Sequence, residues 1–127
     1  MIGDERPHDI RQKAFQYSLR AIRLYQALQE IRDGAGWIIG KQYLRAATSI
    51  GANLEEAQAG ETRADFVHKC GIAQKEIRES LYRLRLLHEA KLLPVKRLRP
   101  LEIETKELYA VITAIIRNTK ARTNTRR

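Results

Sequence analysis

Several features that would exclude whole classes of protein are scarce or missing in this chain. Cys70 is the only cysteine among 127 residues, so no disulfide can form within the chain, and a reducing compartment is favoured. No stretch approaches the roughly 18 apolar residues that a membrane span needs. The first residues, "MIGDERPHD", contain no apolar run that would indicate a signal peptide. We therefore expect a cytoplasmic protein of one domain, residues 1–127, with no membrane partner.

Residue patterns that carry catalysis or bind metal are also missing. The three histidines are His8, His68 and His88. His68 and Cys70 lie two positions apart, so on a helix they point about 200° apart and cannot share a metal ion. The sequence contains no HExxH motif, no paired CxxC and no glycine-rich phosphate loop. We expect no enzymatic activity, no cofactor and no metal site.

Acidic residues are too few to balance the basic ones. The chain carries 24 Lys and Arg against 15 Asp and Glu, a formal net charge of +9. Residues 61–127 hold sixteen of these basic residues and only eight acidic ones, whereas the two charges nearly balance over residues 1–60. Such asymmetry favours a polyanionic partner, nucleic acid ahead of an acidic membrane surface. A merely solubilising surface is the alternative.

Proline and glycine are sparse enough that helical periodicity dominates the whole chain. The pattern predicts four helices, at about 9–32, 38–58, 63–91 and 100–119. The last helix has an alternative start near Val95, with a bend at Pro100. Four amphipathic helices with short connections predict an all-α fold, an antiparallel up-down-up-down four-helix bundle. We expect the basic tail, 117–127, to be partly disordered.

Apolar residues recur in each helix at the three- and four-residue steps of a bundle seam. The first helix carries a seven-residue seam from Ile10 to Ile31, which Phe15, Ile22 and Tyr25 are expected to widen. The core positions of the other helices are Ile39, Tyr43, Ala46, Ala47, Ile50, Leu54 and Ala57; Phe66, Cys70, Ala73, Ile77, Ser80, Leu84 and Leu87; and Leu101, Leu108, Val111, Ile112 and Ile115.

The excess basic residues are the candidate nucleic-acid contacts. Two stretches contain no acid, "KLLPVKRLR" at 91–99 and the last eleven residues, and Arg78, Arg83 and Arg85 lie partway along the third helix. A basic stripe along the third and fourth helices would suit a phosphate backbone, with salt-sensitive binding and weak sequence specificity. Ordinary solvated helix faces are the alternative. With little aromatic interleaving, stacking on single-stranded bases is not indicated. The candidates are Arg78, Arg83, Arg85, Lys91, Lys96, Arg97, Arg99, Arg117, Lys120, Arg122, Arg126 and Arg127.

The stretch "RAATSIGANLEEAQAG", 45–60, contains poor helix formers within a helical pattern. Its polar residues form a stripe beside the apolar one, and Glu76 and Glu79 of the third helix are expected to border it. We interpret it as a structural or assembly motif, a buried or interfacial polar network with Gly51 allowing close approach. A solvated face is the alternative. The motif residues are Gln42, Arg45, Ser49, Gly51, Asn53, Glu56, Glu76 and Glu79.

Residues 44–87, "LRAATSIGANLEEAQAGETRADFVHKCGIAQKEIRESLYRLRLL", resemble the S23 or 23S rRNA-intervening-sequence proteins. The later part, "LLPVKRLRP", departs from the family, in which the fourth helix often starts directly from a Ser or acidic cap. The matching positions are Gln42, Arg45, Ala46, Ser49, Ile50, Gly51, Ala52, Asn53, Glu56, Ala57, Thr62, Asp65, Phe66, Ile72, Ala73, Glu76, Glu79 and Ser80.

This resemblance implies more than the composition does. Family members are encoded within bacterial 23S rRNA genes or elsewhere in genomes, and no enzymatic activity is established for them. They resemble the accessory protein of diversity-generating retroelements, which binds nucleic acid and a reverse transcriptase, and this fold forms homopentameric rings. The resulting hypothesis is a basic homopentamer that binds RNA, with DNA possible. The alternative is an interaction scaffold or accessory subunit for a nucleic-acid enzyme, such as a reverse transcriptase, or for a ribosomal component.

Overall fold

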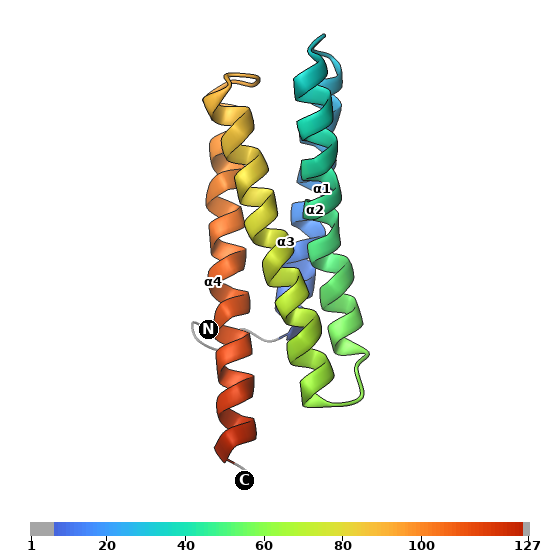
Figure 1. Ribbon diagram of the computed structural model, residues 1–127, viewed down its shortest axis with the longest axis vertical. Helices are drawn as coiled ribbons and strands as arrows, with labels where there is room; N and C mark the ends of the chain where they lie inside the picture. The colour runs from blue at the N-terminus through green and yellow to red at the C-terminus, as the bar shows by residue number, and fades with distance from the viewer. Residues whose placement is uncertain (1–6, 126–127) are drawn as a thin grey trace.

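Four long helices joined by short turns account for nearly all of the chain in the computed structural model, which describes residues 7–125 (Figure 1). They are α1 (Pro7–Gln29), α2 (Gly34–Gln58), α3 (Arg63–Glu89) and α4 (Val95–Thr125). Successive helices run in opposite directions, and within 7–125 there is no strand. The predicted all-α up-down-up-down bundle is confirmed.

The helices are arranged as a square in which each packs on two neighbours. The backbone of α1 lies against α2 and α4, and the backbone of α3 lies against α2 and α4. Across the diagonals, the described backbones of α1 and α3, and of α2 and α4, are not in contact. The α1–α2 face of the bundle therefore lies opposite the α3–α4 face.

The predicted seams form the core. Tyr17 and Tyr43 are its largest fully buried side chains, and Ile10, Ile50, Ile77 and Ile112 are also fully buried. The expected widening of the first seam is wrong at two positions, because Phe15 is 58% exposed and Ile22 39% exposed. Each follows a buried alanine of the seam and is rotated by about 100° from it, toward the outside of the α1–α2 face.

The turn between α1 and α2 differs from its prediction. Asp33 is the N-cap of α2 and accepts a hydrogen bond from the Gly36 amide at 2.9 Å. The Trp37 indole donates to the carbonyl oxygens of Leu28 (3.0 Å) and Ile31 (2.7 Å), at the end of α1. The residues "DGAG" therefore begin α2, four positions earlier than expected, and α1 ends three positions earlier.

Helix α4 takes the alternative start that the sequence left open. It begins at Val95 and not at Pro100, and Leu98 in its first turn is fully buried. Burial of Leu98 compensates for the backbone hydrogen bond that Pro100 cannot donate. The helix also continues to Thr125 and not to 119, so the described part of the expected disordered tail is helical.

Candidate nucleic-acid interface

The densest group of predicted cations lies where α3 turns into α4. Lys91 is in the turn and the others lie in the first two turns of α4, so three of the four are helical and not in a loop. All are exposed, and the first turn of α4 contains no acidic residue. The N-terminus of a helix carries a partial positive charge, so this group and the helix end attract an anion together. Its members are Lys91, Lys96, Arg97 and Arg99.

The three arginines predicted on α3 do not share one surface. Arg78 and Arg85 are exposed on the outer row of the helix, which leads toward the turn. Arg83 lies two positions before Arg85 and therefore points to a different side of the helix, where it lines a groove between α2 and α3. We therefore define the turn-end surface as Arg78, Arg85, Lys91, Lys96, Arg97 and Arg99.

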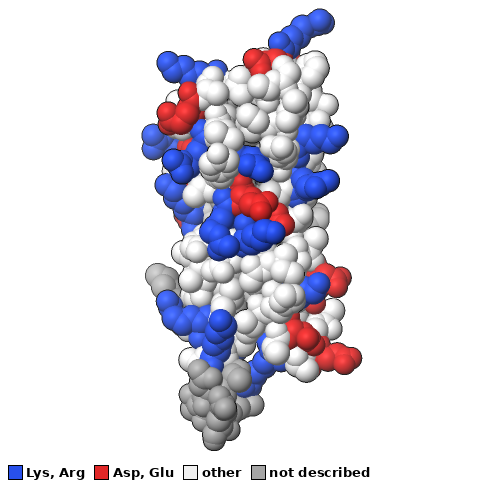
Figure 2. All heavy atoms as spheres, viewed as in Figure 1, with Lys and Arg blue, Asp and Glu red and all other residues white. Residues whose placement is uncertain are grey.

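A second basic group lies at the other end of α4. Arg117, Lys120 and Arg122 are exposed there. Lys120 lies 23 positions after Arg97 on the same helix, which corresponds to about 35 Å. Figure 2 shows blue side chains, with red ones among them, over the upper half of the visible face and further blue side chains near its lower left, with a largely uncharged band between. The predicted stripe is thus divided in two, and Arg126 and Arg127 lie outside the described residues.

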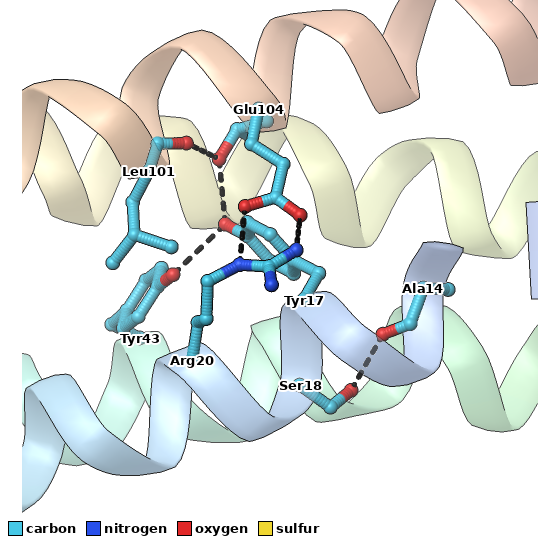
Figure 3. Close-up of polar contacts among 8 residues, drawn as sticks. Ala14, Tyr17, Ser18, Arg20, Tyr43, Leu101 and Glu104 are labelled. Carbon is cyan, nitrogen blue, oxygen red and sulfur yellow. Dashed lines mark hydrogen bonds and ion pairs between the residues drawn. The ribbon is translucent and has the colours of Figure 1, made fainter. Parts of the chain in front are cut away.

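The cations of the turn-end surface are free of intramolecular ion pairs among the described residues. Two of the nearby carboxylates have other partners: Glu102 contacts His88 Nδ1 at 3.2 Å, and Glu104 forms a two-point ion pair with Arg20 (Figure 3). The hydrogen bond with Glu104 raises the pKa of the Arg20 guanidinium. Since these two acids are already paired, the cations remain available to an external anion.

The polar stripe of α2 does not link helices within the chain. Ser49 donates to the Arg45 carbonyl oxygen at 2.8 Å, and Asn53 donates to the Ser49 carbonyl oxygen at 2.9 Å. Both bonds stay within α2, while Gln42 and Glu56 are exposed. An inter-helix network within one chain, as one form of the prediction had it, is absent among the described residues. An interface with another molecule stays a prediction.

The two glutamates expected beside this stripe do lie near it. Glu76 and Glu79 line a groove of about 610 Å³ between α2 and α3 together with Gln42 and Arg45. Burial raises the pKa of Glu76, and the charge of Glu79 raises it further, while Lys75 and Arg45 oppose the shift. Arg45 is therefore one of the cations that stabilise this carboxylate.

Gly51 is not required for close packing of α1 against α2. A methyl group at this position would lie 3.6 Å from Cβ of Ala14, which is ordinary van der Waals contact. At Gly40 the same methyl group would lie 2.6 Å from Cδ1 of Leu28, a buried side chain. Within the chain, the glycine that close packing requires is Gly40, and close approach of another molecule at Gly51 stays a prediction.

A buried chain of hydroxyl groups was missed by the sequence analysis (Figure 3). Tyr43 donates to the Tyr17 hydroxyl at 2.9 Å, and the Tyr17 and Thr105 hydroxyls are 2.6 Å apart. Because Thr105 donates to the Leu101 carbonyl oxygen at 2.6 Å, Tyr17 is the donor to Thr105. Burial raises the pKa of Tyr17 to about 12. The signal in the sequence was two tyrosines at seam positions, which were interpreted only as apolar volume.

The described residues provide neither a metal-binding cluster nor a membrane-spanning helix. No group of three or more His, Cys, Asp or Glu side chains within the described part of the chain is placed to hold a metal ion. None of the helices, over the residues described, is long and apolar enough to cross a membrane.

These features define a class: a small, basic four-helix bundle with an exposed cationic end and a hydroxyl chain in its core. The chain belongs to the 23S rRNA-intervening sequence protein family, whose model matches residues 6–114. A crystal structure of a protein of unknown function from the S23 ribosomal protein family of Bacteroides thetaiotaomicron is similar, with a TM-score of 0.80 and 31% identity. The similarity covers 87% of this chain and 97% of that one. No curated protein matches this sequence.

Proposed function

We propose that this protein is a non-enzymatic nucleic-acid-binding bundle that acts in the cytoplasm and contacts the phosphate backbone with its α3–α4 face. The observation that carries the proposal is the turn-end surface, six exposed cations without an intramolecular ion pair among the described residues. Such cations release counterions when they meet phosphates, which drives binding without sequence specificity. RNA is favoured over DNA because the family takes its name from an rRNA insertion.

The opposite face of the bundle supports self-association. Phe15 and Ile22 expose apolar side chains on the α1–α2 face, and the contacts Arg11–Glu55 and Ala14–Gly51 place this part of α1 beside the small residues of α2. Exposed apolar side chains that lie on the same side of a helix are candidates for a protein–protein contact. A ring of five chains, as the family resemblance suggests, would carry about +45 and bind RNA multivalently.

Paired substitutions test whether the turn-end surface binds RNA. Arg97→Gln with Arg99→Gln should weaken binding of a labelled RNA about tenfold at 50 mM salt, measured by fluorescence anisotropy. The matched control is Arg23→Gln with Arg32→Gln. It removes the same charge from exposed positions in the last turns of α1 and in the turn after it, and should change affinity much less. Equal losses in both variants, or no binding by the unaltered protein, would contradict the proposal.

Self-association is tested separately by light scattering. The unaltered protein should give a mass several times 14.7 kDa, and Phe15→Ser should lower it. Ile103→Ser serves as the control, because Ile103 is similarly exposed, at 50%, but lines the groove between α1 and α4. A clean monomer for the unaltered protein would remove the ring from the proposal and leave RNA binding to be judged by the arginine variants.

A further inference from the structure

We propose that Tyr82 stacks on an unpaired nucleobase, so that the protein prefers RNA with single-stranded nucleotides over an uninterrupted duplex. This inference rests on the proposed function and specifies the form of RNA that the α3–α4 side of the bundle recognises.

Tyr82 is the one tyrosine whose ring is mostly exposed. Its side chain is 52% exposed, whereas Tyr17 and Tyr43 are fully buried in the hydroxyl chain and Tyr25 and Tyr109 are partly buried. Among residues 7–125 its hydroxyl has no hydrogen-bond partner. The ring therefore contributes little to the bundle's own packing, and the face that does not meet Arg83 is available to a ligand.

Arginine residues surround this ring. Arg78 lies four positions before Tyr82 and Arg85 three positions after it, so both are its neighbours on the outer row of α3, at about 5–6 Å between Cβ atoms. The guanidinium carbon of Arg83 lies 5.4 Å from the ring centroid, a cation–π contact that restrains the ring. Glu79, three positions before Tyr82, is also a neighbour and pairs with Lys75 at 3.9 Å, while no acidic residue occurs between positions 80 and 88.

This arrangement matches the requirements of single-stranded binding. Such sites combine an exposed aromatic ring, on which a base stacks, with cations that contact the phosphates on either side. Arg78 and Arg85 flank the ring along the helix axis, so they can contact the phosphates before and after a stacked nucleotide. In an uninterrupted duplex the faces of the bases are covered by their neighbours, so that duplex can use the arginines but not the ring.

The sequence alone argued against stacking because aromatic residues are few among the basic ones. The exposure of Tyr82 changes this interpretation, since one accessible aromatic ring between arginines is enough to stack one nucleobase. The proposal also explains why an aromatic residue occupies the outer row, where the positions on either side of it, Arg78 and Arg85, are charged and exposed.

The experiment compares two RNAs with equal numbers of phosphates, a single strand without internal pairing and a paired stem made of two fully complementary strands, which has no loop. Affinities are measured by fluorescence anisotropy at 50 mM salt for the unaltered protein, Tyr82→Phe and Tyr82→Leu. We expect Tyr82→Leu to weaken single-strand binding about tenfold, and Tyr82→Phe to retain it, because the ring and not the hydroxyl stacks. Binding of the paired stem should stay within twofold for both variants.

Three results would overturn the inference. Tyr82→Leu could leave single-strand affinity unchanged, or it could weaken both RNAs equally. It could also lower the mass found by light scattering, which would assign the ring to a contact between subunits. In each case the proposed function still stands if Arg97→Gln with Arg99→Gln weakens RNA binding, whereas an unaltered protein that binds neither RNA would refute both.

Discussion

At the scale of single residues, the hydroxyl chain from Tyr43 through Tyr17 to Thr105 is the feature that most specifies this bundle. It joins α2, α1 and α4 at one level of the core, and every donor in it has an acceptor. The neighbouring Ser80 of α3 is fully buried and donates to its own helix at 2.9 Å. Satisfied buried polar groups favour one packing arrangement, because any other would leave a hydroxyl without a partner.

Removing the central hydroxyl should therefore be costly. Tyr17→Phe leaves the Tyr43 hydroxyl buried without an acceptor, and we expect the free energy of unfolding to fall by about 1–3 kcal/mol. Urea denaturation followed by circular dichroism measures the change. Tyr82→Phe is the control, since that exposed hydroxyl has no partner within residues 7–125, and a similar stability loss in both variants would contradict the role given to the chain.

The same chain predicts a loss of stability in alkaline solution. Burial raises the pKa of Tyr17 from 10.0 to about 12, so the folded state holds its proton more tightly than the unfolded state does. The contribution of the protonated Tyr17 to the free energy of unfolding is complete below pH 10 and is lost as the pH rises toward 12. Burial also raises the pKa of Tyr43, and that of the Cys70 thiol to about 11.

Urea midpoints measured from pH 9 to pH 11.5 test this dependence. The midpoint of the unaltered protein should fall over this range, and that of Tyr17→Phe should fall less steeply. Cys70→Ala removes the contribution of the thiol and serves as the comparison. A midpoint independent of pH in the unaltered protein would show that the tyrosine is not held in its neutral form by the fold.

Substitution of Lys91 should change stability and RNA binding in opposite directions. It has a φ of 58°, the left-handed conformation at the end of α3, where glycine is favoured. Lys91→Gly should raise the free energy of unfolding by about 1 kcal/mol and at the same time weaken RNA binding, because a cation of the turn-end surface is lost. Lys96→Gln removes a neighbouring charge without the backbone effect. Unchanged RNA affinity in both variants would exclude these lysines from the interface.

At the scale of helices, the sequence predicted the buried faces well and the ends poorly. Most seam positions are buried as expected, and the others pack partly buried against the core, because periodicity identifies the face that an amphipathic helix turns to its core. The ends depend on particular contacts across turns. Asp33 and Trp37 determine the start of α2. Burial of Leu98 determines the start of α4, because a fully exposed first turn would not offset the hydrogen bond that Pro100 cannot donate.

Two glycines of α2 give opposite predictions for the same substitution. Gly51→Ala should raise the free energy of unfolding by roughly 0.5–1 kcal/mol, and the thermal midpoint with it. Alanine favours the helix, and its methyl group meets only ordinary contacts. Gly40→Ala should lower it, since the new methyl group would force Leu28 to move within the core. Thermal unfolding of the two variants tests these opposite shifts. Destabilisation by Gly51→Ala would indicate that another molecule packs against this position.

At the scale of the whole molecule, properties are divided among faces of the bundle. Cations gather at the turn end of the α3–α4 side, and exposed apolar side chains lie on the opposite α1–α2 face. The sequence identified the excess cations but not their grouping, because this depends on the rotation of each helix. Arg83 and Arg85 are two positions apart, yet only Arg85 lies on the outer row. The buried hydroxyl chain was likewise invisible, since it joins residues 88 positions apart.

The salt dependence of RNA binding tests the central claim most directly. If the six cations of the turn-end surface meet phosphates, the logarithm of the binding constant should fall linearly with the logarithm of salt concentration between 50 and 200 mM, with a slope of about −4 to −5 for each subunit. Arg97→Gln with Arg99→Gln should reduce the steepness by about 1.5. A slope near zero, or no RNA retained at 50 mM salt, would contradict the account.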